Sequence, residues 1–239
     1  MTVPELHPNR APRWLTPLVR AATAVDIRAM TRYTQPQPGN EPRRHAAVLV
    51  LFGETADGGP DVVLQHRADG LRNHAGQVAF PGGGREAGDG DPVQTALREA
   101  AEETGLDPAG IDPLTMLPEL FIPPSGYLVT PVLAYWREPV AVRAVDPGEC
   151  TAVVRVPVSW LADPANRFWV RHTSGHVGPA FQVAGLVVWG FTGGLVDSLL
   201  RMGGWERPWS SPGVRDLEWA WQAARDSRIG LGGVSGADA

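Results

Sequence analysis

The sequence predicts an α/β protein, because runs typical of buried strands are combined with two segments of helical periodicity. Residues 43–52 and 61–66 are strand-like runs separated by a glycine-proline turn. Residues 92–104 and 191–201 place apolar side chains at helical spacing, so that each segment would bury one face. With 239 residues, of which 43% are hydrophobic, the chain is long enough to bury a sizeable core.

Further segments complete the expected order of elements. Strands are expected at 114–121, 127–135, 152–158, 168–171 and 181–188, the last two as a hairpin. The chain divides into an N-terminal extension with one helix (1–42), a main domain (43–205), and a C-terminal helix near 216–226 with a flexible tail (206–239). The first helix, at 15–30, would pack either on the domain or on a partner subunit, which leaves a homodimer open. Residues 36–40 are typical of a linker.

Composition narrows the classes of function. A net charge of -5 and a pI near 5.7 argue against general nucleic-acid binding, which needs a basic surface. No apolar run approaches the ~20 residues that span a bilayer, and the first residues lack a secretory core. The single cysteine, Cys150, excludes an intramolecular disulfide. We therefore expect a cytoplasmic protein without nucleic-acid or membrane partners, in which a metal and arginines attract an anionic substrate.

The helix at 92–104 has clear signals at both ends. Asp91 is a good N-cap, and Pro92 suits the first helical position. Gly105 suits the left-handed residue that ends a helix. These signals fix the length of the helix and therefore the direction in which its side chains point.

Three glutamates, Glu99, Glu102 and Glu103, lie together on the face of this helix opposite its apolar side. Acids at this spacing repel one another and oppose the helix dipole by roughly 0.3–1 kcal/mol each. A divalent cation reverses the effect, because Mg²⁺ and Mn²⁺ prefer hard oxygen ligands. Arg98 can hold Glu102 in orientation from one turn away. The alternative is a solvated acidic face, the usual fate of such charge runs.

The segments around this helix supply candidates for substrate binding and catalysis. Gly82 and Gly83 let backbone N–H groups approach an anion, which a helix N-terminus also favours. Arg67 and Arg72 precede them, and an arginine fork binds phosphate oxygens through two hydrogen bonds. The alternative is surface arginines that pair with an acid or with solvent. Glu149, in a later loop, is a candidate general base or extra metal ligand, although a loop glutamate is more often solvated.

The loop and the helix together resemble the Nudix box of the Nudix hydrolases. The residues that carry this resemblance are Gly83, Asp89, Arg98, Glu99, Ala100, Glu102, Glu103, Gly105 and Leu106. The box ordinarily reads Gly-x5-Glu-x7-Arg-Glu-U-x-Glu-Glu-x-Gly-U, where U is a bulky apolar residue. Here the loop is one residue longer, its acid is Asp89 or, in another alignment, Asp91, and Ala100 is small.

A second motif lies directly upstream and resembles the extra signature of the coenzyme A diphosphatase branch of that family. It is carried by Leu64, Arg67, Ala68, Arg72, Gly76, Phe80, Pro81, Gly82 and Gly83. The signature usually begins Leu-Leu-Thr-x-Arg, whereas this chain has Val63-Leu64-Gln65-His66-Arg67. The two motifs follow each other in the order that this branch has.

The resemblance implies a Nudix-type α/β/α sandwich around a mixed β-sheet and a metal-dependent hydrolase with a nucleotide-type substrate. Mg²⁺ or Mn²⁺ would be held by Glu99 and Glu103, with Glu102 as the next candidate. The substrate would be coenzyme A or acyl-coenzyme A, cleaved to 4'-phosphopantetheine, or its acyl form, and adenosine 3',5'-bisphosphate. Two alternatives stay open: hydrolysis of another nucleoside diphosphate such as ADP-ribose or a dinucleotide, and a catalytically silent Nudix-like binding module.

Overall fold

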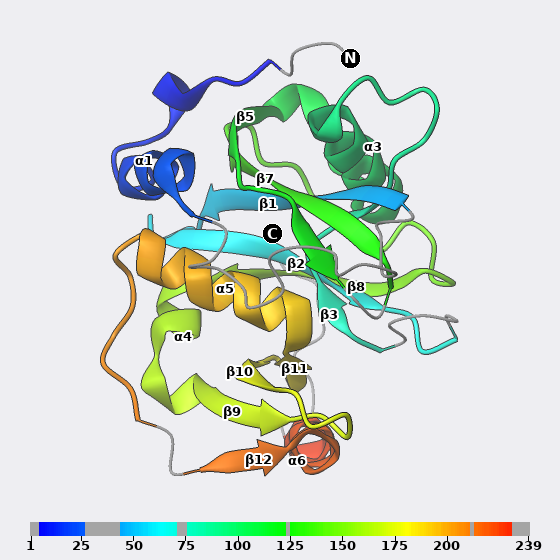
Figure 1. Cartoon of the computed structure of the whole chain (residues 1–239), viewed down its shortest axis with the longest axis vertical. Helices are drawn as coiled ribbons and strands as arrows, with labels where there is room; N and C mark the ends of the chain where they lie inside the picture. Colours follow the sequence, from blue (N-terminus) through cyan, green and yellow to red (C-terminus); the bar gives the residue numbers. More distant parts are fainter. Residues whose placement is uncertain (1–4, 27–43, 71–75, 123–124, 211–212, 231–239) are drawn as a thin grey trace.

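Two β-sheets flanked by helices form the framework of the molecule (Figure 1). The computed structural model describes residues 5–26, 44–70, 76–122, 125–210 and 213–230. Arg72, the expected linker at 36–40, the far end of the first expected helix and the end of the C-terminal tail lie outside these ranges.

The larger sheet has eight strands in the described part of the chain. They are β1 (Arg44–Glu54), β2 (Pro60–Arg67), β3 (Val78–Ala79), β4 (Gly82–Gly84), β5 (Ile111–Met116), β6 (Leu120–Ile122), β7 (Tyr127–Trp136) and β8 (Cys150–Pro157). The central order is β3-β2-β1-β7-β5, while β4 pairs with β1, β6 with β7 and β8 with β2. β1 and β7 run parallel, from Arg44 opposite Tyr127 to Phe52 opposite Tyr135, and the other pairs are antiparallel. The expected mixed sheet is confirmed.

Successive side chains of β1 point to opposite faces of this sheet. Leu49 and Leu51 belong to the core on the side of α3 (Pro92–Thr104). Val50 and Phe52 belong to the core on the side of α5 (Gly190–Met202). Figure 1 shows α3 on one side of the sheet and α5 on the other. This layering confirms the α/β/α sandwich.

The N-terminal helix α1 (Thr16–Ala24) is part of the main core. It follows a 3₁₀ turn at Pro8–Arg10, and Leu15 and Leu18 are 0% exposed. Both leucines contact the same buried cluster as α5. Of the two arrangements expected for this segment, packing on its own domain is therefore confirmed, and a homodimer stays a prediction.

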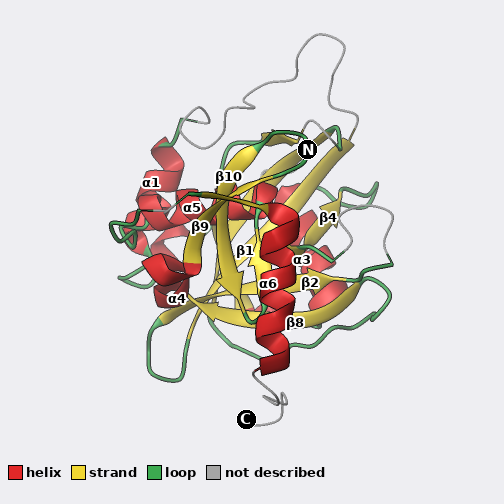
Figure 2. Ribbon diagram, turned by 90° about the horizontal axis from the view of Figure 1, so that it is seen from below, coloured by secondary structure: helices red, strands yellow, loops and turns green. Residues whose placement is uncertain are grey.

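The smaller sheet lies beyond α5, and the sequence did not predict it as a separate sheet. Its strands in the described part of the chain, in spatial order, are β11 (Leu186–Val188), β10 (Val177–Val183), β9 (Arg167–Arg171) and β12 (Val214–Asp216). Helix α6 (Leu217–Gly230) packs on it through apolar side chains and runs along it in Figure 2. The expected C-terminal helix is thus confirmed, with a later end. A short helix, α4 (Val158–Ala162), and 3₁₀ turns at Pro108–Gly110 and Pro164–Asn166 complete the elements.

Two expected strands are each divided in the structure. The run expected at 114–121 forms β5 and β6, with Pro118 in the gap, because proline has no N–H for the sheet ladder. The run expected at 181–188 forms β10 and β11, which are joined by a tight turn at Ala184 and Gly185, both with positive φ. β10 begins before Phe181, so its hairpin with β9 is longer than expected.

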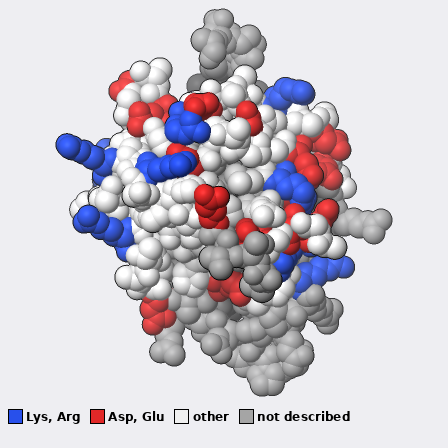
Figure 3. All heavy atoms as spheres, turned by 90° about the horizontal axis from the view of Figure 1, so that it is seen from above, with Lys and Arg blue, Asp and Glu red and all other residues white. Residues whose placement is uncertain are grey.

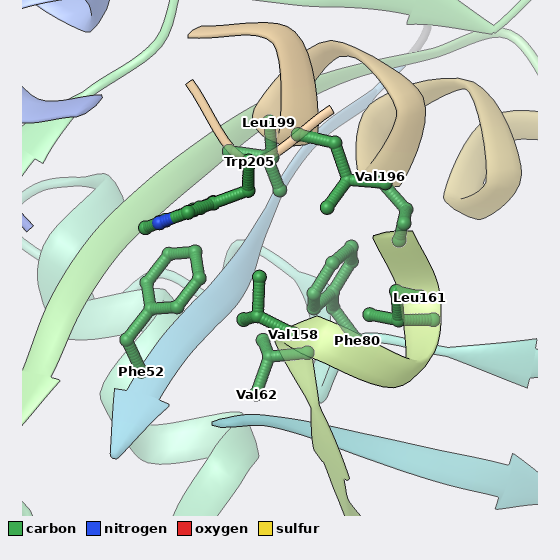
Figure 4. Close-up of a pocket in the computed structure, with 9 residues that line it drawn as sticks. Phe52, Val62, Phe80, Val158, Leu161, Val196, Leu199 and Trp205 are labelled. Atoms are coloured by element: carbon green, nitrogen blue, oxygen red, sulfur yellow. The ribbon is translucent and has the colours of Figure 1, made fainter. Parts of the chain in front are cut away.

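The core between the sheet and α5 closes around a void of about 10 Å³ (Figure 4). In this view Phe52 and Trp205 lie on one side of the void and Phe80 and Leu161 on another. All of its lining is apolar, and the volume is at the lower limit of what a single water molecule needs. It is too small to be a substrate site.

Among the helices of the described residues, none is both long and apolar enough to cross a membrane.

Candidate active site

Helix α3 has the limits that its sequence predicts. The carboxylate of Asp91 accepts hydrogen bonds from the backbone N–H groups of Val93 and Gln94, at 2.8 and 3.0 Å. Gly105 has a left-handed backbone, with φ of 70°, and its N–H donates to the carbonyl oxygen of Ala101. The cap satisfies amide groups that a helix start leaves without partners. The position of every later side chain on α3 follows from this start.

Glu103, near the end of α3, is buried and held by three donors. Its Oε2 accepts from the side-chain amide of Gln65 at 2.7 Å and from the N–H of Gly82 at 2.9 Å. Its Oε1 lies 3.3 Å from Nη1 of Arg67. Burial raises the pKa of Glu103 and outweighs the opposite effect of these donors. The carboxylate is therefore fixed in orientation and poorly solvated.

Glu99 lies one turn before Glu103, with its carboxylate against Gly83. The carboxylate occupies the space that a side chain at Gly83 would need. Burial raises the pKa of Glu99 more than the neighbouring Arg98 guanidinium lowers it. Glu99 also lines an open hollow, and its side chain is 18% exposed.

Arg98 connects the loop, the strand and the helix. Its guanidinium donates to both carboxylate oxygens of Asp89, at 3.0 and 3.1 Å, and to the carbonyl oxygen of Gly84 at 3.0 Å. It also lies 3.1 Å from Oε1 of Glu99 and 2.9 Å from Oε2 of Glu102. The expected contact between Arg98 and Glu102 is present. Asp89, and after it Glu99, raises the pKa of Arg98, so its charge is permanent.

The structure decides between the two alignments of the loop acid. Asp89 accepts from Arg98, from the hydroxyl of Thr95 and from the N–H of Glu86. These bonds, led by that of Arg98, lower its pKa to about 2. Asp91 caps α3 instead. Asp89 is thus the acid that anchors the loop to the helix.

Gly82 and Gly83 belong to β4, which pairs with β1 and does not form the start of α3. A Cβ at Gly82 would lie 2.3 Å from the carbonyl oxygen of Ala47, so only glycine permits this approach. The N–H of Gly82 already donates to Glu103. The expectation that this amide cradles a phosphate is therefore wrong, and its observed role is to orient a carboxylate.

The three glutamates do not form a ready-made metal cage. In the described ranges no group of three or more His, Cys, Asp or Glu side chains is arranged to hold a metal ion. The side chain of Glu102 is 60% exposed and points to Arg98, whereas Glu99 and Glu103 both face the glycines of β4.

Two of the glutamates nevertheless suit Mg²⁺ or Mn²⁺. Mg²⁺ in phosphate-transfer sites usually uses one or two carboxylates and takes its other oxygens from water and substrate. Glu99 and Glu103 are poorly solvated, and a cation would offset that cost. The side-chain oxygen of Gln65, beside Glu103, is buried without a hydrogen-bond partner among the described residues. We conclude that the residues fit a divalent cation bound by Glu99 and Glu103.

Arg67 and Glu149 lie at the same end of the sheet. Arg67 is the last residue of β2 and pairs with Glu103, while its binding of a substrate phosphate stays a prediction. The carbonyl oxygen of Glu149 accepts from the N–H of Ala68 at 2.9 Å, and its side chain is exposed. The structure therefore brings Glu149 to the end of β2, next to the ion pair of Arg67 and Glu103.

An open hollow of about 690 Å³ adjoins Glu99. It is lined by Arg44, His45, Gly84, Arg85, Glu86, Ala87, Glu99 and Tyr127. Sequence reasoning missed Arg44, Arg85 and Tyr127, although Arg85 directly follows the glycines. Figure 3 views the molecule from the side on which α3 lies in Figure 1 and shows acidic and basic side chains interspersed on this face.

Comparisons with known proteins agree with the observed fold. A model of the NUDIX domain matches residues 41–174. The uncharacterized Nudix hydrolase NudL of Shigella flexneri is 29% identical over 193 residues, which cover 75% of this chain and 94% of that protein. Nudix hydrolase 15, mitochondrial, of Arabidopsis thaliana is 39% identical over 128 residues, or 53% of this chain and 44% of that protein. The crystal structure of the Nudix hydrolase RenU from M. smegmatis has the same fold, with a TM-score of 0.50 and 24% identity over 68% of this chain and 86% of that one.

Proposed function

Because the chain belongs to the Nudix family, we propose that it hydrolyses the diphosphate bond of coenzyme A or of an acyl-coenzyme A. Membership alone gives the coarser activity, hydrolysis of the diphosphate bond in a nucleoside diphosphate derivative. The choice of coenzyme A is supported by the signature that ends at Gly83. The products would be 4'-phosphopantetheine, or its acyl form, and adenosine 3',5'-bisphosphate. A cytoplasmic location, the domain limits at 43–205 and a homodimer stay predictions.

The observation that carries the proposal is the pairing of two poorly solvated acids with two adjacent glycines. Gly82 donates to Glu103, and Gly83 makes room for Glu99. Both acids have pKa values raised by burial. A fold gains no stability from this arrangement alone, because desolvated carboxylates that lie one helical turn apart repel each other. A divalent cation and the charged oxygens of a diphosphate would complete it.

The chain's own residues would have distinct roles in the reaction. Mg²⁺ or Mn²⁺, when bound by Glu99 and Glu103, supplies charge neutralisation at the phosphate oxygens and lowers the pKa of water. Gln65 and the N–H of Gly82 hold the carboxylate of Glu103 in one orientation. Arg98 holds Glu99 from the other side. This preorganisation keeps the reacting groups in place without rearrangement during the reaction.

The positions of Arg67 and Glu149 suggest a role for each in the reaction. Arg67 lies against Glu103 and its side chain is 25% exposed, so it would contact a phosphate oxygen of the substrate. Glu149 is exposed at the same end of β2 and would accept the proton of the attacking water. As a test of this role, Glu149→Gln should lower kcat and leave KM near its wild-type value.

One assay tests the proposal as a whole. The purified full chain is incubated with coenzyme A, acetyl-coenzyme A or ADP-ribose in Mg²⁺ or Mn²⁺, and the products are identified by mass. We expect adenosine 3',5'-bisphosphate and a phosphopantetheine from the coenzyme A substrates. A clear preference for ADP-ribose would show that coenzyme A is not the substrate. Binding without product in either metal would support a silent binding module instead.

A further inference from the structure

The hollow beside Glu99 lies at one end of the larger sheet. Side chains at the starts of two strands and just after a third strand line it. Arg44 begins β1 and Tyr127 begins β7, and the two residues are opposite each other in the parallel register. The N–H of Arg85, just after β4, donates to the carbonyl oxygen of His45 at 2.9 Å, which extends the pairing of β4 with β1. The backbone therefore places two arginines and a tyrosine around one hollow.

Within the described part of the chain, neither Arg44 nor Arg85 has an ion-pair partner, so both keep their positive charge in these contacts. Nη1 of Arg44 lies 3.4 Å from the hydroxyl of Tyr127, a long hydrogen bond to a neutral group. Arg85 donates from Nε and Nη2 to the carbonyl oxygens of Asp89 and Gly90, at 3.1 to 3.3 Å. These acceptors are also neutral, so they hold the guanidinium of Arg85 in place without neutralising it. An anchored guanidinium loses little freedom when it binds an anion.

The two acids that line the hollow, Glu86 and Glu99, are both directed to Arg98, which also pairs with Asp89 and Glu102. Glu99 lies 3.1 Å from Arg98, and Glu86 lies 3.8 Å from the same guanidinium. Under the proposed function, Glu99 also holds a divalent cation. The two arginines are therefore available for an anionic group of the substrate, while the acids are directed to Arg98 and the metal.

We propose that Arg44 and Arg85 bind a phosphate monoester that the substrate carries outside the scissile diphosphate. This inference rests on the proposed function and names the part of the substrate that the hollow receives: the half that ends as a nucleoside 3',5'-bisphosphate. A phosphate monoester carries up to two charges and three acceptor oxygens, which suit two arginine forks. The pantetheine half is uncharged and has no such match. A hollow of about 690 Å³ is also within the size range of nucleotide sites.

In this arrangement Tyr127 is a positioning residue. Its hydroxyl is the acceptor of Arg44, and its own side chain is half-buried. Tyr127→Phe removes the hydroxyl and leaves the ring, so it loosens Arg44 without deleting its charge. We expect its effect to have the same substrate dependence as that of Arg44→Ala, and to be smaller.

The first test compares coenzyme A with 3'-dephospho-coenzyme A, which differs only in the monoester. Wild type should prefer coenzyme A. Arg44→Ala and Arg85→Ala should each lower kcat/KM for coenzyme A by about tenfold to a hundredfold, the range for a hydrogen bond to a charged group. Both should change kcat/KM for the dephospho form less than twofold. Arg20→Ala, an exposed arginine on α1, is the matched control and should change neither value.

The second test does not depend on turnover. Calorimetry measures the binding of adenosine 3',5'-bisphosphate and of adenosine 5'-monophosphate to wild type and to both arginine variants. Only the bisphosphate should bind more weakly to the variants. Equal losses of kcat/KM for both substrates, or of binding affinity for both nucleotides, would overturn the proposed monoester site. If wild type does not cleave coenzyme A yet the variants weaken only the bisphosphate, then the proposed substrate fails and the phosphate site stands.

Discussion

The carboxylate of Glu99 fills the space where a side chain at Gly83 would stand. A Cβ built on Gly83 would lie 2.5 Å from Cδ and Oε2 of Glu99 and 2.6 Å from Oε1. Such distances are far below van der Waals contact, so one of the two groups would have to move. The glycine of β4 therefore sets the position of the acid on α3.

This contact makes Gly83→Ala a probe of the position of Glu99. The added methyl group should displace the carboxylate and lower kcat by at least about tenfold, because small misplacements of reacting groups have large effects on rate. The free energy of unfolding should change little, since the carboxylate can swing toward the hollow. Steady-state kinetics and thermal unfolding measure the two effects.

Gly84→Ala is the control for Gly83→Ala. It makes the same change in the same strand, but its new Cβ would meet only the hydroxyl of Tyr127, at 4.0 Å. We expect a far smaller loss of kcat. Equal losses in the two variants would show that the strand, and not the contact with Glu99, is responsible.

Glu99→Gln should abolish hydrolysis and leave Tm in metal-free buffer unchanged or higher. Burial raises the pKa of Glu99, so the charged form is disfavoured in the fold and a neutral amide relieves that cost. Added Mn²⁺ should raise the Tm of wild type, since a ligand of the native state stabilises it. It should raise the Tm of the variant much less. Retained turnover in Glu99→Gln would remove this residue from the mechanism.

Asp89→Asn should destabilise the protein in a pH-dependent manner. The pKa of Asp89 is lowered from 3.8 to about 2, mainly by Arg98, so its charged form stabilises the fold. That shift corresponds to about 2 kcal/mol of unfolding free energy at neutral pH. The stabilisation is present above pH 3.8 and is lost as the pH falls through about 2. Denaturant titrations of wild type and Asp89→Asn measure this. The difference between their free energies of unfolding should be smaller near pH 3 than at pH 7.

Leu18→Ala tests whether α1 belongs to the core. Leu18 is 0% exposed and packs in the cluster that includes α5, so its truncation should lower the free energy of unfolding by about 2–5 kcal/mol. Arg20→Ala, on the exposed side of the same helix, should change it by less than about 0.5 kcal/mol. A small loss of unfolding free energy in Leu18→Ala would mean that α1 contributes little to the core. Light scattering on the same samples would report whether wild type is a dimer.

The sequence predicted most accurately where the signals are local. The cap of Asp91 and the left-handed Gly105 gave the limits of α3 without error, because each acts within one turn of the residue that carries it. The same holds for the contact of Arg98 with Glu102, four residues apart. The mixed sheet and the sandwich followed from the resemblance of the motifs to a known family.

What the sequence missed depends on pairing between distant segments. Gly82 looked like a free anion donor because nothing nearby reveals that β4 pairs with β1 or that Glu103 takes its N–H. Arg44 and Tyr127 are far apart in the chain and meet only through the parallel register of β1 and β7. The choice between Asp89 and Asp91 likewise required the position of Arg98 in space.

Arg85 and Arg98 bind the same short loop through different groups of Asp89. Arg85 binds the backbone carbonyl oxygen of Asp89, and Arg98 binds the carboxylate of the same residue. Arg98 in turn contacts Glu99, at 3.1 Å. The hollow and the carboxylate of Glu99 on α3 therefore share one anchoring residue, Asp89.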